Sequence, residues 1–131
     1  MKGFIADIED RTEANRDFRR VLYTGPHMQL VLMALQPGED IGEEIHEDTD
    51  QFFRVEEGKG EVWIDGQATA IESDFAIVIP ARAKHNIKNT SDKPLKMYTI
   101  YAPPHHADAT VHKTKADAAV ATEHFAGTTS E

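Results

Sequence analysis

Short apolar segments, each closed by a turn signal, run through most of the 131 residues. Asp65-Gly66, placed between two of these segments, is the strongest hairpin signal, and Pro37-Gly38 and Pro80 end two strongly apolar runs. The segments expected to form strands are 18–23, 28–35, 41–46, 51–57, 61–64, 67–72, 75–79, 85–88 and 96–101. Eight or nine strands at this regular spacing predict an all-β sandwich or barrel.

The two flanking segments differ in composition from this strand-rich part. Residues 1–17 are expected to form an N-terminal segment before a barrel domain at 18–103, and within it the polar residues 10–17 are expected to form a loop or one helical turn. In residues 104–131, Thr114 can cap an alanine-rich helix that runs to about His124, and the chain is expected to fray from Gly127. The prediction is therefore a single domain with a short C-terminal helix.

Acidic residues outnumber basic ones by 23 to 14, which gives a net charge of -9. Because nucleic acids and anionic membranes need a positive protein surface, neither is expected as a partner. The absence of cysteine excludes disulfides, thiolate metal sites and cysteine nucleophiles. No apolar run reaches the ~18 residues of a membrane span, and the sequence turns acidic within its first ten residues, unlike a signal peptide. A cytoplasmic location is expected.

Four side chains of metal-binding type occur where the strands of one barrel could bring them together. Glu44 and His46 are two residues apart, so on a strand they face the same side. Gln51 opens the next strand, and His85 follows the turn that begins at Pro80. Two imidazoles, one carboxylate and one amide oxygen suit a divalent first-row metal. Each residue alone is more often structural, but the set predicts a metal site formed by Glu44, His46, Gln51 and His85.

The segments around these residues resemble the two sequence motifs of the cupin superfamily. The matches are the glycine at Gly38, the spacing Gln51-x6-Gly58 and the spacing Pro80-x4-His85-x3-Asn89. The resemblance covers roughly residues 18–103 and is strongest to small stand-alone bacterial cupins, often labelled mannose-6-phosphate-isomerase-like. It implies a double-stranded β-helix, which is a small jelly-roll barrel. It also implies a divalent transition metal (Fe, Mn, Ni, Co or Zn) held by a His-x-His pair, a glutamate and a later histidine.

The ligand positions depart from the usual cupin pattern but keep its total charge. Glu44 stands where the first histidine usually is, Gln51 where the metal glutamate usually is, and Arg82 replaces a glycine. The usual three histidines and one glutamate carry one negative charge, and so do two histidines, one glutamate and one glutamine. Glu44, His46 and His85 alone form the two-histidine, one-carboxylate set of non-haem iron sites. Gln51 is then a fourth ligand or a hydrogen-bond partner of the ligands.

Two classes of function fit this reading. The first is a metal-dependent enzyme, of isomerase or oxygenase type, acting on a small organic molecule in the barrel. The second is a non-catalytic module that binds a small ligand or a metal. The resemblance also suggests a homodimer. Residues 39–57 hold nine acids and one base, a net charge of -8, which favours a cation at the barrel mouth and opposes a phosphorylated substrate.

Outside the motifs, two further groups of residues carry weaker signals. The tail histidines are expected to be solvated rather than to form a metal site; they are His105, His106, His112 and His124. Phe52 and Phe53 are consecutive, so one of them faces out of the sheet. The outward residue, expected to be Phe52, marks either a dimer surface or a surface covered by the N-terminal segment.

Overall fold

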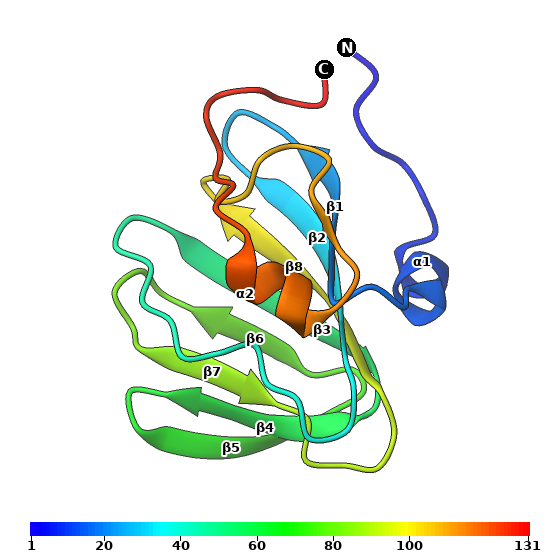
Figure 1. Cartoon of the computed structure of the whole chain (residues 1–131), viewed down its shortest axis with the longest axis vertical. Coiled ribbons are helices and arrows are strands. Elements are labelled where there is room, and N and C mark those ends of the chain that lie inside the picture. Colours follow the sequence, from blue (N-terminus) through cyan, green and yellow to red (C-terminus); the bar gives the residue numbers. More distant parts are fainter.

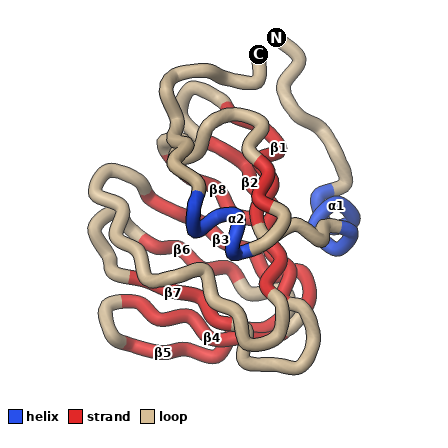
Figure 2. The backbone as a smooth tube through the Cα atoms, in the orientation of Figure 1, coloured by secondary structure: helices blue, strands red, loops and turns tan.

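The computed structural model describes all 131 residues and contains two β-sheets and two short helices (Figures 1 and 2). The large sheet has the strand order β6-β3-β8-β2-β1-β9, and the small sheet has the order β5-β4-β7. The elements are α1 (Ile8–Ala14), β1 (Arg19–Thr24), β2 (Gln29–Leu35), β3 (Asp50–Glu57), β4 (Lys59–Ile64), β5 (Gln67–Glu72), β6 (Ala76–Ile79), β7 (His85–Lys88), β8 (Leu95–Ala102), β9 (Val111–His112) and α2 (Lys115–Val120). The prediction of an all-β jelly roll with a C-terminal helix is confirmed.

Alternation of buried and exposed residues explains how the two sheets enclose one core. On β3, Gln51, Phe53 and Val55 are buried, whereas Phe52 and Arg54 between them are only partly buried. The same alternation along β8 buries every second residue. Because successive side chains of a strand point to opposite faces, one face of each sheet supplies the core. Seventeen buried apolar residues form a single cluster between the sheets.

The β4–β5 hairpin turns at Asp65 and Gly66, as the sequence predicts. Their φ angles are 47° and 84°, so both central residues are in the left-handed region. A two-residue turn of this kind matches the twist of the flanking strands, and glycine adopts it without steric cost.

Residues 41–46 do not form the strand expected there. Only two isolated bridges tie this region to β7, one from Asp40 to Lys88 and one from Glu44 to His85. Three residues lie between the two bridges on one side and two on the other, so the pairing shifts by one residue between them. Gly42 lies in this interval with a φ of 94°. The segment is therefore an irregular edge of the small sheet, and it places Glu44 directly beside His85.

The C-terminal segment is more closely tied to the barrel than the sequence suggested. β9 pairs with β1 through Val111 and His112, and α2 lies over the space between the two sheets in Figure 1. The helix has the capping box expected at Thr114, but it ends at Val120 rather than near His124. The expected fraying from Gly127 is wrong, because Ser130 donates a backbone hydrogen bond to Thr24. No helix has the length and apolar character needed to cross a membrane.

Candidate metal centre

Two backbone segments meet at the site. Glu44 and His46 lie on the irregular segment that follows β2, and His85 is the first residue of β7. The backbone N–H of Glu44 donates to the His85 carbonyl at 2.9 Å, and the N–H of His85 donates to the Glu44 carbonyl at 2.9 Å. This reciprocal pair fixes the two backbones side by side, so their side chains enter the same space.

Three of the four predicted ligands converge. Ligand atoms of Glu44, His46 and His85 all lie within 4.8 Å of one another. Glu44 Oε2 and His46 Nε2 are 2.9 Å apart, close to the ~3 Å that separates two atoms bound at a right angle to one ion with ~2.1 Å bonds. His46 and His85 are buried, and the side chain of Glu44 is about one-third exposed. The cluster therefore sits just inside the protein surface.

The hydrogen bonding of the histidines leaves one nitrogen of each ring free to bind a ligand. His85 Nδ1 lies 3.0 Å from the Ala83 carbonyl oxygen, which accepts only if Nδ1 carries the hydrogen. The lone pair of His85 is then on Nε2, which is buried without a partner. His46 Nε2 is also buried, and it lies 2.9 Å from Oε2 of the Glu44 carboxylate. Because buried polar atoms are nearly always satisfied, two such nitrogens beside a carboxylate fit a metal ion.

Gln51 occupies the barrel interior at the start of β3, opposite Tyr101 of β8. Its Nε2 donates to Thr99 Oγ1 at 2.9 Å. This bond sets the orientation of the amide and leaves the buried Oε1 without a hydrogen-bond partner. An amide oxygen in this state can act as a neutral ligand or accept a hydrogen bond from a bound molecule.

The electrostatic environment keeps the Glu44 carboxylate ionised. Burial alone raises its pKa, but close contact with His46 and the charges of His46, Arg19 and His85 outweigh burial, so the pKa is lowered from its ordinary value. An ionised carboxylate is the form that binds a metal.

A wall of aromatic rings from the tail adjoins the cluster and was not anticipated. The ring centroid of His105 is 4.5 Å from that of His46, and Tyr101 stacks on His105 at 5.4 Å. His106 Nδ1 lies 2.8 Å from Glu123 Oε1, and its Nε2 lies 3.3 Å from the Tyr101 hydroxyl. The expectation of solvated tail histidines is therefore wrong for His106 and for the buried His112, which are built into the barrel end.

Only some of the residues at this end of the barrel could have been predicted from the sequence. Tyr101 is in phase with the buried Met97 and Thr99, and Arg19 is in phase with the buried Val21, so alternation places both inside. The tail histidines have no such periodicity. Their backbone is positioned by Gln29, whose side-chain oxygen accepts from the N–H groups of His105 and His106.

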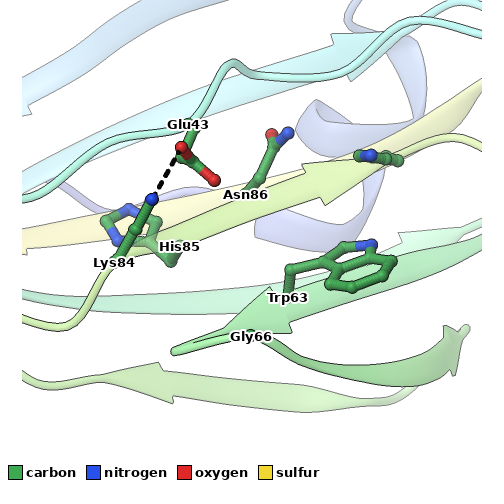
Figure 3. Close-up of a pocket in the computed structure, with 7 residues that line it drawn as sticks. Glu43, Trp63, Gly66, Lys84, His85 and Asn86 are labelled. Carbon is green, nitrogen blue, oxygen red and sulfur yellow. Dashed lines mark ion pairs between the residues drawn. The ribbon is translucent and has the colours of Figure 1, made fainter.

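A separate cleft of about 270 Å³ lies on the outer face of the small sheet. Figure 3 shows Lys84 and Glu43 pointing toward each other across it, with an ion pair at 3.2 Å, and the indole of Trp63 below them on β4. Trp63 alternates with the buried Val62 and therefore faces away from the core. His85 lines this cleft, but Glu44 and His46 do not, so the cleft is distinct from the point where the three ligand atoms converge.

Comparison with known proteins places the chain in a family. The family described as "Cupin domain" matches residues 31–101. The chain is 48% identical to the uncharacterized protein YrkC of Bacillus subtilis, over 92% of this chain and 68% of that protein. It is 30% identical to polyketide synthase CurC of Streptomyces cyaneus, over 76% of this chain and 67% of that protein. The crystal structure of BH2720 from Bacillus halodurans superimposes with a TM-score of 0.90 at 51% identity, over 92% of this chain and 96% of that one. The chain is a member of the cupin family.

Proposed function

We propose that this cupin is a metal-dependent enzyme acting on a small organic substrate. Glu44, His46 and His85 hold a divalent first-row transition metal, and Gln51 provides a fourth oxygen. The observation that carries the proposal is the convergence of one ionised carboxylate with two buried imidazole nitrogens: His85 Nε2 has no hydrogen-bond partner, and His46 Nε2 lies against the carboxylate itself. Two histidines and one carboxylate leave coordination positions open, which suits a substrate more than a closed structural site.

A metal held there supplies Lewis-acid chemistry to an isomerase or, if it is iron, dioxygen chemistry to an oxygenase. The protein's own residues orient and enclose the reactants. The Ala83 carbonyl fixes the ring of His85, and Thr99 fixes the amide of Gln51. The side chain of Tyr101 is fully buried, which raises its pKa to about 12 and keeps the phenol protonated. Tyr101 can therefore donate a hydrogen bond within the barrel at neutral pH.

The size of the space beside the ligands supports a small substrate. A cavity of about 200 Å³ is lined on one side by Glu44 and on the other by α2. Phe18, Ile41 and the α2 alanines give it apolar walls. The name of the relative CurC also connects one member of this group with the metabolism of small organic molecules.

Metal content tests the proposal directly. Protein purified without a histidine tag is analysed for bound elements, and the metal-free protein is titrated with Mn²⁺, Fe²⁺, Co²⁺, Ni²⁺ and Zn²⁺ by calorimetry. We expect one ion per chain, and its loss in His46→Ala and His85→Ala. His27→Ala removes an exposed histidine and should bind as the wild type does. A wild-type protein that binds none of the five metals would contradict the proposal.

The segments that cover the site favour a second candidate function, that of a non-catalytic module that retains a metal or ligand. Residues 105–112 and α2 enclose the barrel end, and His105 packs on His46. A metal that is bound tightly, with no small molecule able to change its visible spectrum, would favour this module over the enzyme.

We further propose that the protein is a cytoplasmic homodimer joined through the outer face of the large sheet. Leu30, Ile100, Phe52 and Val78 form one row across four neighbouring strands. Val78 is 67% exposed, and β6 has no strand partner on its outer side. The row has no charged residue, so two copies can meet there despite a net charge of -9 on each.

A further inference from the structure

Arg19 is a buried cation with few partners. It begins β1, between Met33 of β2 and His112 of β9, and only 7% of its surface is exposed. Its Nη1 lies 3.1 Å from His112 Nδ1, and its Nε is buried without any hydrogen-bond partner. No carboxylate oxygen lies within the 4.0 Å of an ion pair. A buried charge is costly unless it is paired.

No group around Arg19 forms an ion pair with it: the Glu123 carboxylate contacts His106 and His112 but does not come within ion-pair distance of Arg19. Burial and then the charge of Arg19 lower the pKa of His106 and His112, so both rings are neutral at pH 7. Tyr101 is protonated for the reason given above. Glu44 senses the charge of Arg19 but lies beyond ion-pair distance. Arg19 is therefore a fixed donor that lacks an anion.

Arg19 lines the same cavity as Glu44, one of the proposed metal ligands. Both Arg19 and Glu44 line the space of about 200 Å³ under α2. The guanidinium carbon sits 5.3 Å from the centroid of the Phe18 ring, a cation–π contact that holds the side chain in place. A molecule of a few heavy atoms in this cavity can approach both the guanidinium and the Glu44 edge of the proposed metal centre.

The local charge favours an anion once a metal is bound. A divalent ion, the Glu44 carboxylate and Arg19 together carry a charge of about +2. Two nearby acids that would repel an anion are already paired, Asp40 with Lys115 and Glu43 with Lys84. The acidic composition of residues 39–57 therefore does not extend to this cavity.

We propose that Arg19 binds the carboxylate of a small organic acid whose neighbouring oxygen coordinates the metal, as in a 2-hydroxy or 2-oxo acid. The planar guanidinium matches a carboxylate in two parallel hydrogen bonds, which a compact cation does not. The inference rests on the proposed function, because it takes the metal centre as given, and it adds the substrate class.

The test uses full-length, Co²⁺-loaded protein and the matched probes glycolate and glycolamide, which differ in charge but hardly in size. Binding is followed by calorimetry and by the visible spectrum of Co²⁺. We expect glycolate to bind the wild type at least tenfold more tightly than glycolamide. Arg19→Gln should abolish this preference while keeping Co²⁺ affinity within threefold of the wild type. Arg20→Gln changes the exposed neighbouring arginine and should keep the preference.

Each outcome bears on one of the two proposals. Equal binding of both probes to the loaded wild type, an unchanged preference in Arg19→Gln, or preferential binding of inorganic phosphate would overturn the inference. If Arg19→Gln does not fold, Arg19→Lys keeps the charge without the planar fork and should lose most of the glycolate preference. Failure to bind Co²⁺ contradicts the proposed function, and coordination of the acid's second oxygen fails with it. The contact between Arg19 and the carboxylate then stands only if metal-free wild type still prefers glycolate to glycolamide.

Discussion

Glu44 carries the only negative charge among the four predicted ligands, so the metal affinity should depend on it more than on any other acid nearby. We expect Glu44→Gln to weaken Co²⁺ binding at least tenfold, about 1.4 kcal/mol, because the two neutral histidines and Gln51 then face the cation without a counter-charge. Calorimetry on the metal-free proteins measures the change. Glu43→Gln is the matched control, since the side chain of Glu43 is 63% exposed and pairs with Lys84 outside the barrel. Equal losses in the two variants would show a general field effect rather than a ligand.

The sequence indicates which side chains of one strand share a face, but it does not indicate which distant segments come into contact. The two-residue spacing of Glu44 and His46, the turn before His85 and the resemblance to the cupin motifs together predicted that these side chains meet, although residues 41–46 form no strand. Their order around the site depends on the bridge from Glu44 to His85. His112 lies 93 residues from its partner Arg19. No periodicity connects positions so far apart, because their contact exists only after the sheets have closed.

Among the elements, α2 depends most on side-chain attachment. It has six residues, far fewer than the ~12–15 that an isolated helix needs. Its first residue, Lys115, is paired with Asp40, and Asn86 donates to the same carboxylate at 2.8 Å. These contacts hold the helix over the cavity that we assign to substrate.

The pKa of Asp40 gives this attachment a pH dependence. The hydrogen bond from Asn86, and then the one from Lys115, lower the pKa of Asp40 below its ordinary value. A carboxyl group with a lowered folded pKa stabilises the protein above its unfolded pKa of about 3.9, and this contribution is lost as the pH falls through the folded pKa. We expect Asp40→Asn to cost about 1 kcal/mol at pH 6 and progressively less toward pH 3.

Urea unfolding at several pH values measures this difference. Asp48→Asn serves as the control because Asp48 is exposed and has no bonded partner. A destabilisation by Asp40→Asn that stays constant down to pH 3 would show that the carboxylate's charge is not what holds α2.

Strands with a clear alternation were predictable, and the two misread elements show why others were not. The expected strand at 41–46 has the right residue types, but its register with β7 slips at Gly42. β9 has two residues, too short to show a period of two. Both elements are defined by what they pair with, which a local pattern cannot indicate.

For the whole molecule, the apolar row on the large sheet predicts the assembly state. We expect Val78→Asp to raise the dimer dissociation constant at least tenfold, because each copy would place a charge in an apolar contact. Sedimentation velocity over a range of concentrations measures it. Val120→Asp, on the exposed side of α2, should leave the dimer intact. A wild type that stays monomeric at high concentration would contradict the dimer.

The charge distribution looks different in the folded molecule than along the chain. Of the nine acids in residues 39–57, six have a bonded or ionic partner: Glu39, Asp40, Glu43, Glu44, Asp50 and Glu56. Most acidic side chains of this segment therefore form hydrogen bonds or ion pairs with neighbouring residues. Lys115 and Lys84 offset two of these charges, so the expected opposition to anionic substrates is reduced but not removed.

The strand order also limits the order in which the strands can pair during folding. β8 lies between β3 and β2 in the large sheet, so these strands cannot be joined until Leu95–Ala102 has been made. The small sheet needs only residues 59–88 and can form earlier on the ribosome. Pairing of β1 with β9 comes last and, being the most distant in sequence, is expected to be slow. A nascent chain would thus bring Glu44 to His85 before Arg19 meets His112.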